Sequence, residues 1–262
     1  MSPFILVDKQ PQSARVALSR PDLHNAFNDQ MMQEIIHALE ALGQDEKVRT
    51  IVLSAEGKSF CAGADVNWMK RMVNYSFDEN IADANLLARM LRAIRECPKP
   101  VIARVHGAAF GGGVGLTAAC DMAVALESAV FCLSEVKLGI IPAVISPFVL
   151  EKIGMSGMRR YAITAERFDA REAHRLGLVS HVATSEAELD RWIEEISKAV
   201  AANGPAAIAA CKRTLSEVGG MQWDAVQALT TQRIAELRVS PEGQEGLKAF
   251  LEKRSPNWNS GG

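Results

Sequence analysis

The sequence lacks the patterns that several common classes of protein require. Positive and negative charges nearly balance at a formal net charge of −2, so the surplus of lysine and arginine that attracts nucleic acid is missing. No HExxH metal motif and no GxSxG nucleophile motif occurs, which argues against a metalloprotease and a serine hydrolase. The five cysteines form no CxxC pair. We therefore expect reduced, buried thiols and no metal site.

Long apolar runs are absent as well. No stretch of eighteen consecutive apolar residues occurs, so no membrane-spanning helix is predicted. The first ten residues, MSPFILVDKQ, lack the basic start, apolar centre and small-residue cleavage site of a secretion signal. We predict a cytoplasmic protein without a membrane partner. What the chain does have is 262 residues, 48% of them hydrophobic, which suffices for a packed core domain with a smaller appendage.

Strand and helix patterns alternate through the first two thirds of the chain. Short apolar, β-branched runs predict strands, and apolar residues at helical spacing predict the helices between them. The predicted strands are 4–8, 15–18, 48–54, 101–105, 122–126 and 129–133, and the predicted helices are 28–43, 81–97 and 111–120. This alternation predicts an α/β fold with parallel strand pairing.

The pattern becomes almost entirely helical after about residue 185. Breaks are expected at Gly204-Pro205, Gly219-Gly220 and Ser240-Pro241, because glycine and proline interrupt helices. The apolar stripes of these helices exceed what the segment can bury alone, which indicates contacts between subunits. We predict a core domain over residues 1–190 and a helical oligomerisation region over 191–262.

Three segments of the chain are candidates for a functional site. Residues 59–65 (SFCAGAD) follow a predicted strand, and residues 107–113 (GAAFGGG) lie between a strand and a helix. Glycines there allow backbone N–H groups to approach a ligand at the positive end of a helix. In 131–142, Glu135 is a carboxylate in an apolar stretch, where burial would raise its pKa toward the range of an acid–base catalyst. Each segment alone also has an ordinary structural explanation.

As an ordered series, these motifs resemble the enoyl-CoA hydratase/isomerase (crotonase) superfamily over nearly the whole chain. The resemblance implies a spiral of ββα units with a C-terminal helical trimerisation region, arranged as a homotrimer or a dimer of trimers. It also implies an acyl-CoA substrate and no separate cofactor, since coenzyme A is part of the substrate. The matching motifs are Arg20-Pro21, Asn25-Ala26, Ala62 to Asp65, Gly111 to Gly113 with Cys120-Asp121, Ser134-Glu135, Gly139 to Pro142, Ala173 to Leu178 and Gly246 to Arg254.

The resemblance assigns roles to individual residues. The backbone N–H groups of Ala64 and Gly112 would form an oxyanion hole, each worth on the order of 3 kcal/mol, and Glu135 would be the acid–base group. Ala62 would contact the adenine side of CoA, and Lys253 would lie near the CoA phosphates, often of a neighbouring subunit. The residues expected to bind substrate or CoA are Ala26, Ala62, Gly63, Asp65, Val66, Gly111 and Lys253.

One position departs from the two-carboxylate members of this family. They carry a glutamate three residues after the oxyanion glycine, where this chain has Gly115. Single-carboxylate members include Δ3,Δ2-enoyl-CoA isomerases, in which one glutamate moves a proton between carbons. An isomerase is therefore the principal alternative to a hydratase, and Gly115 becomes a candidate residue of the acyl pocket.

We nevertheless favour a hydratase. Residues 60–69 (FCAGADVNWM) and 141–147 (IPAVISP) look most like bacterial 3-methylglutaconyl-CoA hydratases of leucine breakdown, which form 3-hydroxy-3-methylglutaryl-CoA, and like the related isohexenylglutaconyl-CoA hydratases. Such substrates carry a distal carboxylate, which Lys70 or Arg71 could bind. Trp68 is a further candidate for the acyl pocket. Both cations are equally well explained as solvated residues on the surface of a helix.

RNA binding is the alternative from another class. A mammalian relative binds AU-rich RNA through a lysine-studded first helix, but the corresponding residues 28–47 are acidic with a single lysine. Because binding to nucleic acid needs clustered cations, RNA binding is disfavoured.

Overall fold

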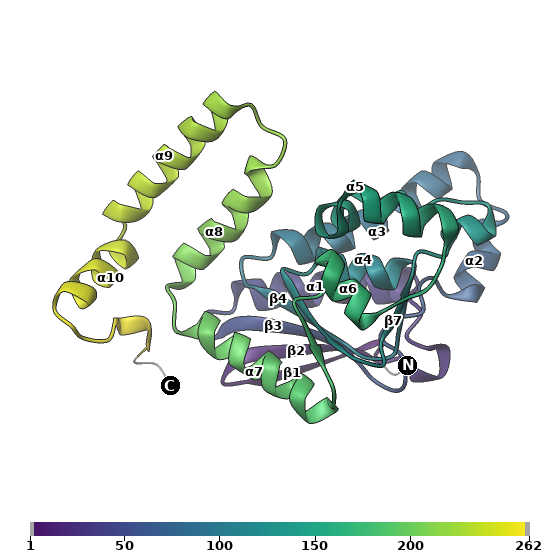
Figure 1. The fold of residues 1–262 in the computed structure, drawn as a ribbon, viewed down its shortest axis with the longest axis horizontal. Helices are drawn as coiled ribbons and strands as arrows, with labels where there is room; N and C mark the ends of the chain where they lie inside the picture. Colours follow the sequence, from purple (N-terminus) through teal and green to yellow (C-terminus); the bar gives the residue numbers. More distant parts are fainter. Residues whose placement is uncertain (1–2, 260–262) are drawn as a thin grey trace.

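The computed structural model describes residues 3–259, which form a layered α/β core and a helical arm (Figure 1). The strands are β1 Ile5–Gln10, β2 Gln12–Leu18, β3 Val48–Ala55, β4 Val101–Val105, β5 Ala108–Phe110, β6 Met122–Leu126, β7 Val130–Cys132, β8 Phe168–Asp169 and β9 His181–Ala183. The helices are α1 Asp29–Gln44, α2 Val66–Met72, α3 Phe77–Glu96, α4 Gly112–Ala119, α5 Ser146–Thr164, α6 Ala170–Leu176, α7 Glu186–Ala201, α8 Pro205–Val218, α9 Trp223–Val239 and α10 Pro241–Leu251. Short 3-10 turns are η1 Pro21–Leu23, η2 Glu135–Leu138 and η3 Asn257–Asn259.

Within the described residues the strands form two sheets. The larger sheet has the order β1-β2-β3-β4-β6-β9, and the smaller has the order β5-β7-β8. Strands β1 and β2 form an antiparallel hairpin, and β2 to β9 of the larger sheet pair in parallel. Parallel neighbours need a crossover connection, which helices such as α1 and α3 supply. The predicted α/β fold with parallel pairing is confirmed.

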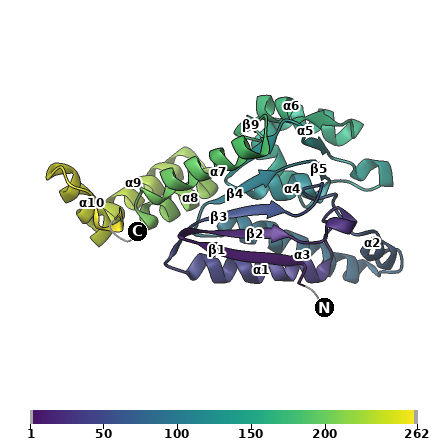
Figure 2. The ribbon, with the colours of Figure 1, turned by 90° about the horizontal axis from the view of Figure 1, so that it is seen from below.

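Both faces of the larger sheet are covered. Ile51 and Leu53 of β3 belong to the main core cluster, whereas Val52 between them belongs to a second cluster with Leu189 and Ile193 of α7. Figure 2 shows α1 and α3 along one side of the strands. Since alternate residues of a strand face opposite layers, a strand covered on both sides is apolar on both faces, as the central residues Ile51 to Leu53 of β3 are.

Local sequence signals set the helix ends. Asn28, at the predicted start of this helix, caps α1: its side chain accepts a hydrogen bond from the Met31 N–H (3.0 Å). The helix continues one residue beyond the expected stop at Gly43. In the C-terminal part all three predicted breaks are confirmed, and α8 and α10 begin at Pro205 and Pro241. Proline suits the first position of a helix because its missing N–H would have no partner there.

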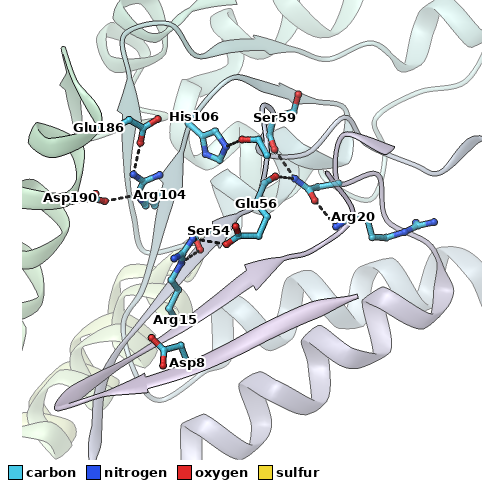
Figure 3. Close-up of polar contacts among 12 residues, drawn as sticks. Asp8, Arg15, Arg20, Ser54, Glu56, Ser59, Arg104, His106, Glu186 and Asp190 are labelled. Atoms are coloured by element: carbon cyan, nitrogen blue, oxygen red, sulfur yellow. Dashed lines mark hydrogen bonds and ion pairs between the residues drawn. The ribbon is translucent and has the colours of Figure 1, made fainter. Parts of the chain in front are cut away.

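The change from core to arm comes later than the predicted boundary at residue 190, which falls inside α7. Helix α7 contacts β3, β6 and β9, and its Glu186 and Asp190 bind Arg104 of β4 (Figure 3). It therefore belongs to the core. The helices that leave the core are α8, α9 and α10 (Figure 1).

Polar contacts hold the arm, and two of them show how. Lys212 of α8 donates to Asp121, the residue before β6 (2.7 Å), and the lysine side chain is 9% exposed. Glu242 of α10 accepts hydrogen bonds from the backbone N–H groups of Ala206 and Ala207 at 2.9 and 2.8 Å. The first contact joins the arm to the core, and the second caps the start of α8 with the side chain of α10.

Four of the five cysteines are buried as expected, but Cys211 on α8 is exposed. That part of the prediction was wrong because α8 lies in the arm, where only a narrow face of the helix is covered. Over residues 3–259, no helix combines the length and the apolar character needed to cross a membrane. In the same part of the chain, no group of three or more His, Cys, Asp or Glu residues is placed to hold a metal ion.

Candidate active site

The loop before α2 presents a free backbone N–H. Phe27 pairs with Ala64 in a parallel bridge, in which the Phe27 N–H donates to the Gly63 carbonyl and the Asp65 N–H donates to the Phe27 carbonyl, both at 2.9 Å. Successive N–H groups of an extended segment alternate in direction, so the Ala64 N–H points away from Phe27. It has no backbone acceptor among residues 3–259.

The second free N–H belongs to Gly112, the first residue of α4. A Cβ added at Gly63 would lie 3.8 Å from the Gly112 nitrogen, which places this N–H beside the Ala64 loop. A Cβ at Gly112 itself would lie 2.3 Å from Cζ of Phe27, so only glycine allows the ring and the helix to approach this closely. The two predicted oxyanion donors therefore lie in adjacent loops, one of them at a helix N-terminus.

Glu135 completes this group. It begins η2 after β7, and a Cβ at Gly111 would lie 3.1 Å from its Oε1 atom. Burial raises the pKa of Glu135 above its ordinary value, and hydrogen bonds from its own and the Ser134 backbone N–H only partly oppose this. Its Oε2 atom is buried and has no hydrogen-bond partner in the described chain. In this arrangement Glu135 can transfer a proton to or from a bound ligand, while the N–H groups of Ala64 and Gly112 stabilise negative charge that develops on that ligand.

Asp65 supports the Ala64 loop from inside. Its Oδ2 accepts from Arg20 Nη2 at 2.6 Å, with the two side chains 5% and 12% exposed. Its Oδ1 accepts from the N–H groups of Asn67 and Trp68, which caps α2. Burial alone would raise the pKa of Asp65, but the hydrogen bonds from Arg20 and from these two amides together lower it. The carboxylate expected to bind ligand is thus engaged by the protein.

Asn25 belongs to a motif that matches the family, but its structural role in the site was not predicted from the sequence. It is fully buried, has a left-handed backbone (φ 54°), and its side-chain carbonyl accepts from the Arg20 N–H at 2.8 Å. Its amide donates to the carbonyls of Glu56 and Ser59, both at 2.7 Å. Asparagine tolerates the left-handed region better than other non-glycine residues, which is the signal in the sequence that could have identified it.

Replacing Asp65 by asparagine is expected to lower the free energy of unfolding by about 3 kcal/mol at pH 7, because it leaves the largely buried Arg20 charge without its ion-pair partner. A lowered pKa contributes stability above the unfolded value near 3.8, and this contribution is lost as the pH falls through the lower folded value. Urea unfolding from pH 7 to pH 3 should therefore show the difference between wild type and variant shrinking below about pH 3.8.

The matched control for this prediction is Arg71→Gln. It breaks the ion pair with Asp29, whose two side chains are 48% and 51% exposed, so a change below about 1 kcal/mol is expected. Equal losses in the two variants would contradict the role given to Asp65.

Other residues expected to bind CoA line the same loops. Ala26 is 8% exposed, and its carbonyl accepts from Arg20 Nη1 at 2.6 Å. The Ala62 N–H donates to the His24 carbonyl at 2.9 Å. Val66, the first residue of α2, is 65% exposed. The structure thus places the alanines beside Ala64 and leaves Val66 open to contact from outside.

The three acyl-pocket candidates on α2 differ in their surroundings. Trp68 is 3% exposed, and its Nε1 donates to Asp83 at 2.8 Å, so its ring serves the packing of α2. Arg71 donates to Asp29 at 2.7 Å. Lys70 is exposed and forms no ion pair with any described residue. Of the two cations considered from the sequence, Lys70 is the one left free to meet a ligand.

Gly115 lies in the buried part of α4. A Cβ added there would lie 2.4 Å from Cγ2 of Ile145, which is 2% exposed. The apolar side chain of Ile145 therefore occupies the space that a side chain at position 115 would need. This contact explains why the residue is glycine, which the sequence alone did not.

Lys253 is not brought to the site of its own chain. It follows α10 at the far end of the arm, whereas α2 and β7 lie at the opposite side of the molecule (Figure 1). A role of Lys253 in CoA binding thus requires a second subunit.

Comparison with known proteins gives a consistent result. The family model for enoyl-CoA hydratase/isomerase matches residues 9–261. A crystal structure of an enoyl-CoA hydratase from Shewanella pealeana superposes with a TM-score of 0.93 at 44% identity, covering 97% of this chain and 96% of the other. The 2,3-dehydroadipyl-CoA hydratase of Escherichia coli is 32% identical over 255 residues, 97% of this chain and 98% of its own. A peroxisomal Δ(3,5)-Δ(2,4)-dienoyl-CoA isomerase of Arabidopsis thaliana is 34% identical over 256 residues, 92% and 90% of the two chains. The chain, with its α/β fold and C-terminal helices, belongs to the enoyl-CoA hydratase/isomerase family, the crotonase superfamily.

Proposed function

We propose that this protein is a cytoplasmic hydratase that adds water to an α,β-unsaturated acyl-CoA, and that its substrate is 3-methylglutaconyl-CoA, which yields 3-hydroxy-3-methylglutaryl-CoA in leucine breakdown. The observation that carries the proposal is the position of Glu135: a half-buried carboxylate with a buried Oε2 atom beside Gly111, next to the free N–H groups of Ala64 and Gly112. In this proposal the thioester carbonyl oxygen lies between the two N–H donors.

One carboxylate is enough for the atoms to balance. Glu135 takes a proton from water as the water oxygen bonds to C3, and the electron pair of the C2=C3 bond moves onto the thioester oxygen. The enolate collapses as Glu135 returns the proton to C2. Charge develops on the thioester oxygen in the transition state, so the Ala64 and Gly112 N–H groups accelerate the step that creates it.

A distal carboxylate on the substrate suits the free Lys70. Lys70 lies four residues after Val66, so the two share a face of α2 that begins just beyond the Ala64 loop. The relative from Escherichia coli is named for the CoA ester of a dicarboxylic acid. The related isohexenylglutaconyl-CoA would meet the same lysine and stays an alternative substrate.

Replacing Lys70 by glutamine is expected to raise KM for 3-methylglutaconyl-CoA about tenfold, the effect of losing about 1.4 kcal/mol of binding. KM for crotonyl-CoA, which has no second carboxylate, should stay within about twofold, since no ion pair is lost there. Arg71→Gln is the control, because that guanidinium is engaged by Asp29. A parallel rise in KM for both substrates would show that Lys70 does not bind the acyl carboxylate.

Isomerisation is the second candidate function, and the contact between Gly115 and Ile145 favours it. With an apolar group where a second carboxylate would activate water, Glu135 would instead take a proton from C2 of a 3-enoyl thioester and return it to C4. The two reactions share the same oxyanion donors and the same base.

The products distinguish the two functions. The protein is incubated separately with 3-methylglutaconyl-CoA, crotonyl-CoA and 3-hexenoyl-CoA, and the products are identified by mass and chromatography. Hydration adds the mass of one water, whereas isomerisation changes retention without changing mass. Turnover of 3-hexenoyl-CoA alone would refute the hydratase proposal and support the isomerase.

We further propose that the active protein is a homotrimer or a dimer of trimers, in which Lys253 of one subunit reaches the CoA of its neighbour. Large apolar side chains on the arm support this, because exposed patches of this size are costly in a monomer. They are Leu215, Trp223, Ile234, Val239, Leu247, Phe250 and Leu251, between 47% and 81% exposed.

A further inference from the structure

The overlap at Gly115 cannot be relieved by rotating a side chain. A Cβ on Gly115 would lie 2.4 Å from Cγ2 of Ile145 and 2.9 Å from its Cβ. Rotation about the Cα–Cβ bond moves Cγ2, but the Cβ of Ile145 stays where its backbone places it. Any side chain at 115 therefore requires the backbone of α4 or of the residues before α5 to shift, unless position 145 itself is shortened.

This contact lies one helical turn from the acid–base group. The Gly115 N–H donates to the Gly111 carbonyl at 3.2 Å, and four residues of helix span about 6 Å. Glu135 approaches α4 at Gly111, and Ile145 approaches it at Gly115. Helix α5, which follows Ile145, contacts both α4 and η2, so the isoleucine and the glutamate are fixed by the same packing.

We propose that Ile145 is a specificity-determining residue: it fills the space of a second carboxylate with an apolar wall and leaves acid–base chemistry to Glu135 alone. The inference rests on the proposed function, since it assigns a part of the same site. On this proposal the site keeps a single carboxylate because the side chains at positions 115 and 145 match in size. A glutamate at 115 would then contribute to catalysis only when the side chain at position 145 is small.

The test is a set of variants that changes both positions. The single variants are Gly115→Glu and Ile145→Gly, and the double variant combines them. The backbone at 145 accepts glycine because the residue is the N-cap of α5, and the Ile145→Gly single variant measures the cost of the vacated space. The matched control is Gly115→Gln with Ile145→Gly, which has the same size as the double variant but no carboxylate.

Thermal unfolding measures the packing without any substrate. We expect Gly115→Glu alone to lower Tm by roughly 5 °C through overpacking. In the Ile145→Gly background the same substitution should lower Tm by much less or raise it, because the new side chain fills the vacated space. A single Gly115→Glu variant with Tm within about 1 °C of wild type would overturn the proposal, since overpacking would then be absent.

Hydration of crotonyl-CoA measures the chemistry. The Glu-containing double variant should exceed its Gln-containing control about tenfold or more in kcat, and its pH–rate profile should show a second ionisation. Equal rates in two stable double variants would also overturn the proposal. Should the Glu variants fail to accumulate, Gly115→Ala in the presence and absence of Ile145→Gly tests the same coupling in Tm.

Failure of the proposed function would look different. A wild-type protein that hydrates none of the three thioesters would refute the hydratase, while the coupling in Tm would still decide whether Ile145 occupies the space beside Gly115.

Discussion

Replacing Glu135 by glutamine is expected to lower kcat by about two to four decades, the usual span for a general acid–base residue, with little change in KM. Glutamine keeps the size and one acceptor oxygen of the side chain but cannot exchange a proton. The reaction is followed with 3-methylglutaconyl-CoA at saturating concentration, and thioester binding is measured separately by calorimetry. Near-normal turnover in a folded variant would show that Glu135 is not the acid–base group.

The pH dependence gives a second readout of the same residue. A general base must be ionised, so the wild-type rate should fall on the acidic side as Glu135 takes up a proton. Burial raises the pKa of Glu135 above its ordinary value of 4.5, so this fall should begin above the pH at which an exposed glutamate titrates. In Glu135→Gln the residual rate should lose this acidic limb.

The same substitution should not destabilise the protein. A folded pKa above the unfolded value means that stability is highest below the unfolded pKa and is lost as the pH rises through the folded pKa. At neutral pH the ionised Glu135 is therefore a cost, and Glu135→Gln should keep or raise Tm. Glu46→Gln, at an exposed position after α1, is the control and should change neither activity nor Tm. A large fall in Tm for Glu135→Gln would mean that its lower activity reports misfolding.

Truncation before Pro241 is expected to abolish assembly and to raise KM for acyl-CoA by at least about tenfold, because the lysine proposed to contact CoA is removed. It also removes Glu242, whose carboxylate caps α8, and the packing of α10 against α8 and α9. Light scattering gives the mass of the assembly, and steady-state kinetics give KM. A monomer with full activity would contradict the proposed assembly and the role of Lys253.

Point variants separate the two consequences of the truncation. Phe250 and Leu251 are 81% and 77% exposed, so Phe250→Asp with Leu251→Asp should weaken an apolar contact between subunits in a full-length chain. Lys253→Ala should raise KM while leaving the mass of the assembly unchanged. A rise in KM with both variants, but a change in mass only with the first, is the expected result.

The sequence by itself determined the elements and the candidate chemistry. Strands 101–105 and 122–126 and the helix breaks at Pro205 and Pro241 have the predicted positions, because proline, glycine and apolar periodicity act within a few residues of chain. The same local reasoning set a carboxylate in an apolar stretch at Glu135, and burial does raise its pKa.

Only the tertiary structure decided how these pieces meet. Arg71 is paired with Asp29, forty-two residues earlier in the chain, whereas Lys70 is free. This difference depends on the packing of α2 near α1. The assignment of α7 to the core depends on Arg104 of β4, and the meaning of Gly115 depends on Ile145. These contacts join residues distant in the chain, and their geometry follows from close packing of the whole core. A local pattern contains no information on which distant side chain will occupy a given space. For this physical reason the sequence alone could not predict these contacts.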